Sequence, residues 1–335
     1  MTVPALPPIL FRRDFDPPYA TLEEIAPGLR RVVANNPGPY TFRGSATFIV
    51  GRGDVAVIDP GPKDDAHTEA ILASLACTGE RVTHILITHT HPDHSPGTAA
   101  LKERTGATTY GWGKHPIEPG SPEDAFEYPK KGDVDSRNSA DPHDPEKSSE
   151  EHRGDTDFIP DVYLSTGDEV RADTWRTEAL HTPGHIANHL CFAFPDLDTV
   201  FTGDHVMGWS TSVISPPGGH LGDYLQSLQL LSSRPETTYV PTHGAPIMGG
   251  PDFARALIEH RNVRTEQVLH QMAAGVTLIP DMVSALYIGL DERLIPAAGR
   301  SLLAHMIDLI NRGLAVGASN KDGHRIGTNS TFTLA

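Results

Sequence analysis

Cysteine is scarce in this sequence, and long apolar runs are absent. The 335 residues contain only Cys77 and Cys191, which excludes the disulfide frameworks of small secreted domains. No stretch approaches the roughly 20 apolar residues that a membrane helix needs, so we expect no membrane contact. The chain up to Tyr19 is interrupted by prolines and lacks the cleavage pattern of a secretory signal. We therefore expect a cytoplasmic protein whose cysteines are reduced, buried small side chains rather than nucleophiles.

Positive charge is also in deficit. The sequence has 27 Lys and Arg against 43 Asp and Glu, a formal net charge of -16. Such a surface repels phosphate backbones at long range, so nucleic acid is disfavoured as a partner, although a local basic groove is compatible with the total.

Half of the net charge is concentrated in one segment. Residues 115–160 contain thirteen acidic and five basic side chains, which gives -8, together with many Pro, Gly and Ser residues. This composition buries too little apolar surface to offset the entropy of ordering. We predict a long mobile insertion, interpreted either as a solvated surface loop or as a lid over a nearby site.

The remaining sequence patterns divide the chain into two parts. Before the insertion, two β-rich runs enclose the turn at Gly51–Asp54, a buried strand covers Val82–Thr88, and a helix covers Gly97–Arg104. β-like runs alternate with turns over residues 161–206. Residues 251–335 instead favour three helices (Phe253–Ala273, Met282–Ile288 and Ala298–Arg312) and a Gly-rich ribbon, which is the order of a winged helix. We predict one domain over 1–250 and a winged-helix-like domain over 251–335.

The strongest chemical signal follows the predicted buried strand directly. Four side chains that bind divalent metals occur within six residues, namely His89, His91, Asp93 and His94. Imidazole nitrogen and carboxylate oxygen are ligands that suit zinc. Neither helix nor turn formation requires three histidines and an aspartate here, so the cluster indicates a metal site.

Three further candidate ligands end β-like runs later in the chain. His185 follows Thr182-Pro183-Gly184, Asp204 follows Gly203, and His243 precedes Gly244. A neighbouring glycine lets the backbone turn sharply at each position, so each side chain can leave its strand and face a cavity.

The order of these motifs resembles the metallo-β-lactamase superfamily across residues 45–245. The segments from His260 to Gly275 and from Ala298 to Gly317 resemble the winged-helix tail of its β-lactamase-like 2 subfamily. The resemblance implies an α+β fold, a metallo-β-lactamase αββα sandwich followed by a winged-helix-like C-terminal domain. That domain could also cover one side of the active site and present His305 or its neighbours to the cleft, although His305 lies within a regular segment and is itself expected to be structural.

The same resemblance implies a binuclear centre with two divalent metal ions, zinc being expected and iron or manganese the alternatives. His89, His91 and His185 would hold one ion, Asp93, His94 and His243 the other, and Asp204 would bridge them. Asp59 would orient a ligand histidine. A metal-bound hydroxide would be the nucleophile, because two cations lower the pKa of a shared water. Asp93 is the candidate catalytic proton shuttle.

Three functions remain open from the sequence. The first is a metal-dependent hydrolase of an ester, thioester or related acyl bond in a small-molecule substrate, which the acidic surface favours. The second is a single-strand endoribonuclease, because the resembled subfamily contains both endoribonucleases and thioesterases. The third is a non-enzymatic binding module with structural metals, whose C-terminal domain mediates association with a partner or into a homo-oligomer.

Overall fold

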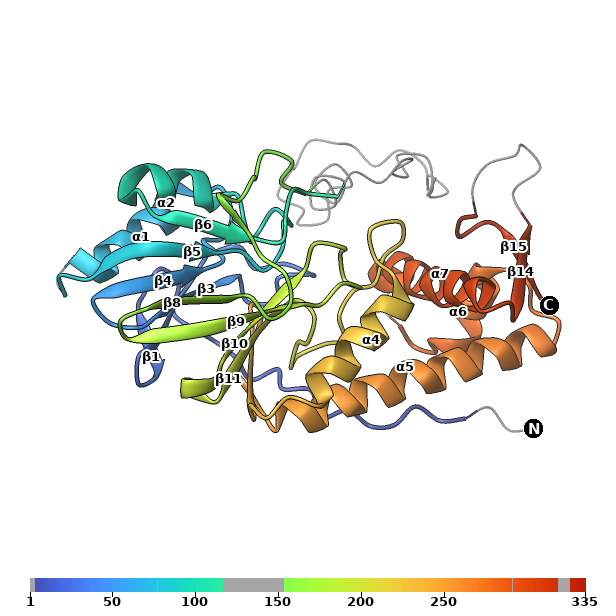
Figure 1. The fold of residues 1–335 in the computed structure, drawn as a ribbon. Helices are drawn as coiled ribbons and strands as arrows, with labels where there is room; N and C mark the ends of the chain where they lie inside the picture. The colour runs from blue at the N-terminus through green and yellow to red at the C-terminus, as the bar shows by residue number, and fades with distance from the viewer. Residues whose placement is uncertain (1–3, 77, 117–153, 291, 319–325) are drawn as a thin grey trace.

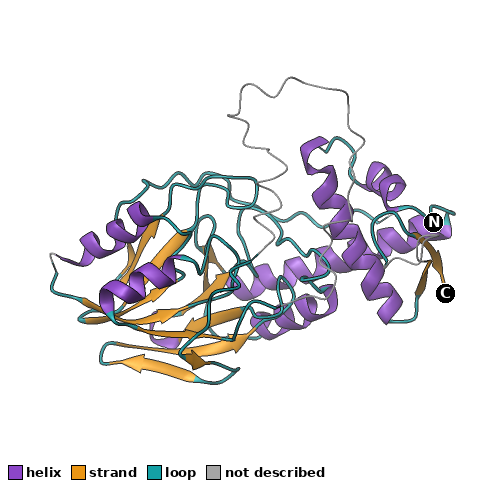
Figure 2. Cartoon of the chain, turned by 90° about the horizontal axis from the view of Figure 1, so that it is seen from above, coloured by secondary structure: helices purple, strands orange, loops and turns teal. Residues whose placement is uncertain are grey.

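A computed structural model describes residues 4–76, 78–116, 154–290, 292–318 and 326–335. The stretch 117–153, which makes up most of the predicted acidic insertion over 115–160, lies outside the described residues. Two β-sheets lie face to face between helices at one end of the molecule, and a mainly helical region occupies the other end (Figure 1 and Figure 2).

In the described part of the chain, the first sheet has seven strands that are hydrogen-bonded in chain order. They are β1 (Glu23–Ala26), β2 (Leu29–Val33), β3 (Ala46–Val50), β4 (Asp54–Ile58), β5 (Arg81–Leu86), β6 (Thr108–Gly111) and β7 (Val162–Tyr163). Pairing is antiparallel from β1 to β4 and parallel from β4 to β7. The parallel strands are connected through α1 (Asp65–Ala76) and α2 (Gly97–Thr105), which cover the outer face of this sheet (Figure 1).

The second sheet, among the described residues, has six strands in the order β13-β12-β11-β10-β9-β8. They are β8 (Glu169–Ala172), β9 (Trp175–His181), β10 (Leu190–Phe194), β11 (Thr199–Gly203), β12 (Thr238–Pro241) and β13 (Ile247–Met248), with a short 3-10 helix, η1 (Pro195–Leu197), before β11. Only the β11–β12 pair is parallel within these six strands. The outer face is covered by α4 (Leu221–Ser232) and α5 (Gly250–Ala273) (Figure 1).

Alternate side chains of the central strands fill separate cores. On β3, Phe48 packs between the two sheets, whereas Ile49 packs under α1 and α2. On β10, Phe192 packs between the sheets and Cys191 packs under α4 and α5. Successive strand residues point to opposite faces, so strands that are apolar throughout are expected where both faces are covered. These layers are the predicted αββα sandwich, and the fold prediction is confirmed.

Cys191 behaves as the sequence predicted. Its side chain is fully buried, and burial raises the pKa of the thiol to about 12. A thiol with this pKa is neutral at pH 7, so Cys191 is a small core side chain and no nucleophile. Cys77 lies outside the described residues.

The C-terminal region forms a further core around the second half of α5. It contains η2 (Glu292–Leu294), the helices α6 (Ile279–Leu286) and α7 (Ile295–Asn311), and a ribbon of β14 (Ala315–Ala318) and β15 (Thr331–Leu334). Val268 and Met272 of α5 pack with α6 and α7, whereas Ala254 and Leu257 of the same helix pack with α4 on the second sheet. One continuous helix therefore belongs to both cores.

The three C-terminal helices each begin three residues before the predicted start. Each has a proline in its first turn, namely Pro251, Pro280 and Pro296. The first-turn N–H groups have no partner within the helix, so proline is tolerated there and does not mark the boundary. None of the helices in the described ranges combines the length and the apolar character needed to cross a bilayer.

We expect a chain that ends at Gly250 to lose cooperative unfolding, because Ala254 and Leu257 leave the core on the second sheet. Burial of one large apolar side chain contributes about 1.5–3 kcal/mol, and α5 supplies several. A chain that ends at Ala274 keeps this packing and should unfold cooperatively at a lower temperature than the full chain. Calorimetry on the three lengths tests the proposed division after residue 250. A chain ending at Gly250 with the full chain's unfolding temperature would contradict the expectation.

Candidate metal centre

The predicted ligands all follow strands that end at one edge of the sandwich. The loop from His89 to Asp93 follows β5, and His185 follows β9. Asp204 and His243 follow β11 and β12, which are parallel neighbours and therefore end side by side. The polar segments between these strands and the helices occupy the place where α/β folds carry their functional groups.

Two glycines make the ligand turns possible. Gly184 has φ of 135°, and a Cβ there would lie 2.3 Å from Tyr224 Cα. Gly203 has φ of 49°, and a Cβ would lie 2.6 Å from His189 Nε2. Any side chain at either position would displace the neighbouring residue. This geometry agrees with the prediction that glycine lets the backbone turn sharply beside His185 and Asp204.

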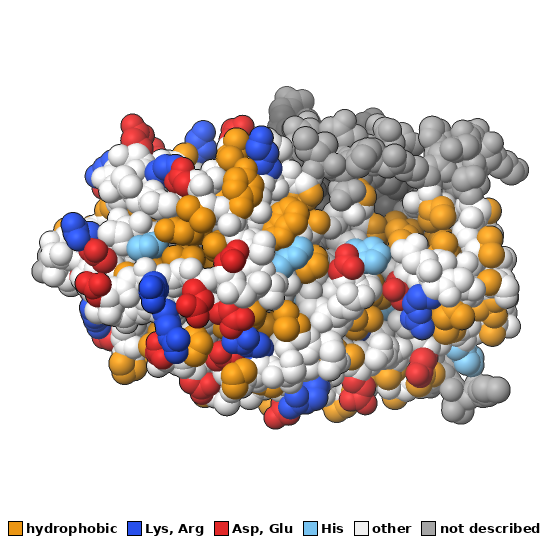
Figure 3. All heavy atoms as spheres, viewed as in Figure 1, with side chains coloured by type: hydrophobic (Ala, Val, Ile, Leu, Met, Phe, Trp, Pro, Cys, Tyr) orange, Lys and Arg blue, Asp and Glu red, His pale blue; other side chains and the backbone are white. Residues whose placement is uncertain are grey.

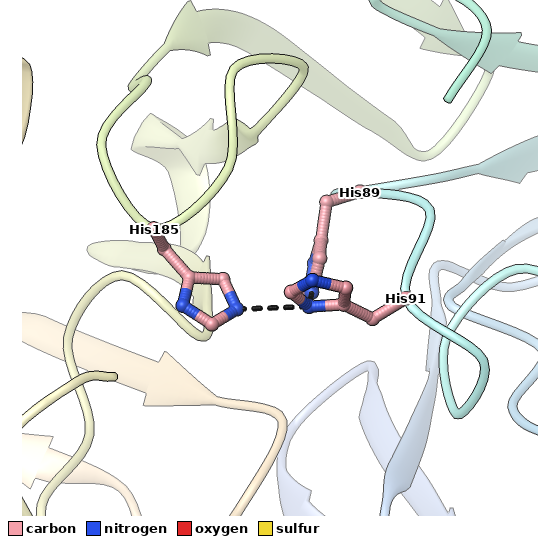
Figure 4. Close-up of side chains that lie close together, drawn as sticks. All are labelled: His89, His91 and His185. Carbon is pink, nitrogen blue, oxygen red and sulfur yellow. Dashed lines mark hydrogen bonds between the residues drawn. The ribbon is translucent and has the colours of Figure 1, made fainter. Parts of the chain in front are cut away.

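Three histidines converge on one point (Figure 4). His89 Nε2 and His185 Nε2 each lie 2.9 Å from His91 Nδ1. The three rings come from two loops that are far apart in the sequence, and their nitrogens point toward one another in the close-up. The three nitrogens lie close enough together to contact a single cation.

A second trio, Asp93, His94 and His243, lies beside the first. Asp93 Oδ2 is 3.4 Å from His94 Nε2 and 3.2 Å from His243 Nε2. Asp204 lies between the two trios. Its Oδ2 atom is 3.8 Å from His185 Nε2 and 3.6 Å from His94 Nε2, and its Oδ1 atom is 3.3 Å from His243 Nε2. The structure thus brings all seven predicted side chains together.

Hydrogen bonds on the outward side fix several of the histidine rings. The Nδ1 atoms of His185 and His243 donate to the carbonyl oxygens of Val213 (2.6 Å) and Gly44 (3.2 Å). His94 Nδ1 donates to the Asp59 carboxylate at 2.9 Å. Since a carbonyl or carboxylate oxygen only accepts, these rings carry a proton on Nδ1. Their Nε2 atoms are thereby left to face the centre.

Asp59 holds two parts of the cluster at once. Its carboxylate accepts hydrogen bonds from the Thr88 N–H (2.8 Å), the Thr88 hydroxyl (2.6 Å) and His94. Because the Thr88 hydroxyl proton is directed to Asp59, its oxygen accepts from His89 Nδ1 at 3.1 Å. Asp59 is buried and has φ of 48°, a left-handed conformation that Asp and Asn tolerate. Its place matches the predicted role of orienting a ligand histidine.

Protonation differs between the two trios. Burial lowers the pKa of His89 and of His91 well below the ordinary value, and neighbouring histidines add to the effect. Burial also disfavours charge on His94 and His243, but the carboxylates of Asp93 and Asp204 outweigh it. They raise the pKa of His94 strongly and that of His243 to about 10. A cation binding to the second trio therefore has to displace protons.

The donor set fits a pair of divalent cations. Two buried atoms that face the cluster, His94 Nε2 and Asp204 Oδ1, have no hydrogen-bond partner among the described residues. Buried polar atoms without partners are rare and costly, and coordination would satisfy both. Five imidazoles and two carboxylates are ligands of the type that zinc and other first-row metals accept.

Sequence reasoning missed the groups that orient the ligands. Ser45 is buried and donates its hydroxyl to Asp93 Oδ2 at 2.7 Å, while Asn36 holds Ser45 through its amide. The carbonyls of Gly44 and Val213 belong to loops without a distinctive residue pattern. Backbone acceptors leave no mark in the sequence, and a single serine before a strand is not distinctive.

Asp93 is the more exposed carboxylate of the centre, with 21% of its side chain accessible, against 10% for Asp204.

Comparison with known proteins defines the family. Residues 39–243 match the model of the Metallo-beta-lactamase superfamily, and residues 279–322 match that of the Beta-lactamase associated winged helix domain. The first match covers more than half of the chain, so the chain belongs to the metallo-beta-lactamase superfamily. The resemblance seen in the sequence and the presence of a C-terminal winged helix are both confirmed.

Relatives extend over most of the chain. An atrochrysone carboxyl ACP thioesterase from Pseudocercospora fijiensis is 28% identical over 308 residues, covering 89% of this chain and 78% of that protein. The lactamase-like protein adaB from Aspergillus niger is 25% identical over 293 residues, covering 83% and 78%. Family membership and the thioesterase relatives confirm the predicted class of enzyme, a hydrolase.

Solved structures share the fold along almost the whole chain. A beta-lactamase domain protein from Burkholderia ambifaria superposes with a TM-score of 0.71 at 18% identity, covering 96% of both chains. A metallo-beta-lactamase family protein from Thermus thermophilus gives a TM-score of 0.68 at 20% identity, covering 93% of this chain and 100% of that one. At these identities the likeness shows the fold alone.

Asp59→Asn is expected to lower the free energy of unfolding of the metal-free protein by about 2 kcal/mol. Asparagine keeps the shape and tolerates the left-handed backbone, but its NH2 group faces buried donors and leaves one of them unsatisfied. Denaturant unfolding in the presence of a chelator measures the change. Asp173→Asn, in an exposed turn, is the control and should change the value by less than about 0.5 kcal/mol. Equal stabilities of the two variants would show that Asp59 does not support the cluster.

Proposed function

We propose that this chain is a hydrolase of acyl thioesters or related esters that depends on two divalent cations, zinc being the expected metal. The convergence of seven donor side chains at one edge of the sandwich, with the outward nitrogens of their rings fixed, supports this proposal most directly. In this proposal, His89, His91 and His185 would hold one cation, Asp93, His94 and His243 would hold the other, and Asp204 would contribute to both.

When bound, the two cations would lower the pKa of a water molecule that they share and polarise the carbonyl oxygen of the substrate. The chain's own residues provide orientation and proton transfer. Asp93 is the carboxylate of the centre more open to solvent, and the Ser45 hydroxyl fixes one of its oxygens. We assign Asp93 the transfer of a proton to the leaving group, since its other oxygen, Oδ1, is not engaged by Ser45.

Three observations support an acyl substrate. Relatives that extend over most of the chain are named atrochrysone carboxyl ACP thioesterases. On the face seen in Figure 3, Lys and Arg are interspersed with Asp and Glu and form no continuous basic surface among the described residues. The net charge of -16 also disfavours a phosphate backbone. A small acyl group on a thiol carrier requires no such surface.

The substrate class is tested with protein that has been depleted of metal and reconstituted with Zn²⁺. The probes are an acyl N-acetylcysteamine thioester, p-nitrophenyl acetate and a single-stranded oligoribonucleotide. The rate of the His91→Ala variant is measured with each probe as the background. We expect kcat/KM for the thioester to exceed that of His91→Ala by at least about 100-fold, because the variant loses a metal ligand. Uptake of two equivalents of Zn²⁺ by the unsubstituted protein is expected in the same preparation.

Two results would contradict the proposal. Cleavage of the oligoribonucleotide with salt-sensitive binding, without thioester turnover, would favour the endoribonuclease. Tight Zn²⁺ uptake without turnover of any probe would favour the binding module with structural metals.

Asp93→Asn tests the proton-transfer role. The amide is close in shape to the carboxylate but cannot accept and release a proton, so kcat is expected to fall by about 100-fold or more. The metal content of the Asp93→Asn variant and of the unsubstituted protein is measured in parallel by inductively coupled plasma mass spectrometry. Asp173→Asn is the control variant. Unchanged turnover at full metal content would remove Asp93 from this role and leave it a ligand only.

A further inference from the structure

A buried arginine connects α5 to the loop that follows β11. Arg261 is 4% exposed and lies midway along α5. Its Nη2 atom donates to the carbonyl oxygen of Ser212 at 2.6 Å, and its Nη1 atom lies 3.4 Å from Ser301 Oγ in the first half of α7. The guanidinium carbon is 5.5 Å from the centroid of the Tyr224 ring.

Arg261 has no acidic partner among the described residues. None of the ion pairs that these residues form includes it, and its Nε atom has no hydrogen-bond partner there. A buried charge without a counterion is costly, so its remaining contacts carry the compensation. The short bond to the Ser212 carbonyl is the strongest of them, because a charged donor shortens and strengthens a hydrogen bond.

The loop held by Arg261 also holds the metal centre. Ser212 donates its hydroxyl to the carbonyl of His205, the residue after Asp204, at 2.7 Å. Val213, the next residue, accepts the hydrogen bond from His185 Nδ1. A rotation of the backbone at Ser212 would therefore change the direction of the carbonyl that fixes His185 and disturb the backbone beside Asp204.

We propose that Arg261 is a positioning residue for His185. By holding the Ser212 carbonyl, Arg261 keeps the Val213 carbonyl in line with His185 Nδ1, so that His185 Nε2 faces His91. The inference rests on the proposed function in one respect, since it takes His185 as a metal ligand. It places a residue of α5, outside both matched segments 39–243 and 279–322, in the support of the metal centre.

This role differs from the one expected for the C-terminal region. His305 is fully buried and its Nδ1 atom contacts the Thr265 hydroxyl at 2.9 Å. This burial is consistent with the structural role expected for His305, and His305 itself is not presented to a cleft. Arg261 contacts the loop after β11 through the Ser212 carbonyl, and Asn311 of α7 contacts the same loop at His220.

The test measures metal binding and not only turnover. Metal-free protein is titrated with Zn²⁺ by calorimetry, and the Co²⁺ form is examined by visible absorption, which reports ligand geometry. The variants are Arg261→Met, Arg261→Lys and His185→Ala. The matched control is Arg255→Met, because Arg255 also lies on α5 and also donates to a backbone carbonyl, that of Ser232 at 2.6 Å, but is half exposed and bonds to a residue of α4 instead of a metal loop.

We expect Arg261→Met to weaken one of the two Zn²⁺ sites by about 10- to 100-fold, the usual effect of losing a group that orients a ligand. The other site should keep its affinity, and the Co²⁺ spectrum should change. Arg261→Lys keeps a charged donor, so it should lose less affinity than Arg261→Met. The weakened site should be the one that His185→Ala removes, so adding Arg261→Met to His185→Ala should cause no further loss. Arg255→Met should leave both affinities unchanged.

A folded Arg261→Met protein with both Zn²⁺ affinities unchanged would overturn the inference. So would equal weakening of both sites together with loss of near-UV circular dichroism, since that pattern indicates a purely structural role. If Arg261→Met does not fold, Arg261→Gln takes its place with the same expected and contradicting results. Failure of the unsubstituted protein to bind two Zn²⁺ ions would instead refute the proposed function, so the two failures are distinguishable.

Discussion

The hydrogen bonds on the outward side of the histidine rings determine what this centre can do. A histidine with two free nitrogens can rotate, exchange tautomers or bond to a neighbouring ring. Here the outward Nδ1 atoms are engaged by one hydroxyl, one carboxylate and two backbone carbonyls, from Thr88, Asp59, Val213 and Gly44. Four rings therefore direct their Nε2 atoms inward, as second contacts of metal ligands commonly do.

The two sheets make this arrangement rigid. Crowding imidazoles and carboxylates below the surface removes them from water, which opposes folding. The loops that carry them are short extensions of β5, β9, β11 and β12, and each of these strands contributes to cores on both faces of its sheet. A loop anchored in this way has little freedom to turn its ligands outward, so the cost of gathering them is met by the packing beneath.

The sequence was informative where side-chain type and strand position coincide. The candidate ligands lie in loops that follow β-rich runs, which marked them as candidates, and the resemblance to the metallo-β-lactamase superfamily implied the convergence that the structure displays. The helix starts were less predictable, because Pro251, Pro280 and Pro296 lie inside first turns and not before them. The groups that orient the ligands were invisible, since Ser45 has no pattern around it and carbonyl oxygens belong to every residue. Contacts across more than a hundred residues, such as Gly44 with His243, require the fold.

The shared helix changes how the C-terminal region should be understood. A winged helix attached by a linker could act as an independent binding module. In this chain α5 packs on the second sheet with Leu257 and on the winged-helix core with Val268, and Arg261 lies between them. Under the proposed role of Arg261, a displacement of α5 would change the hydrogen bond to the Ser212 carbonyl and, through Val213, the support of His185. The C-terminal region therefore contacts the loop beside the candidate metal centre through packing and through the buried Arg261, and the proposed role of Arg261 would extend that contact to His185.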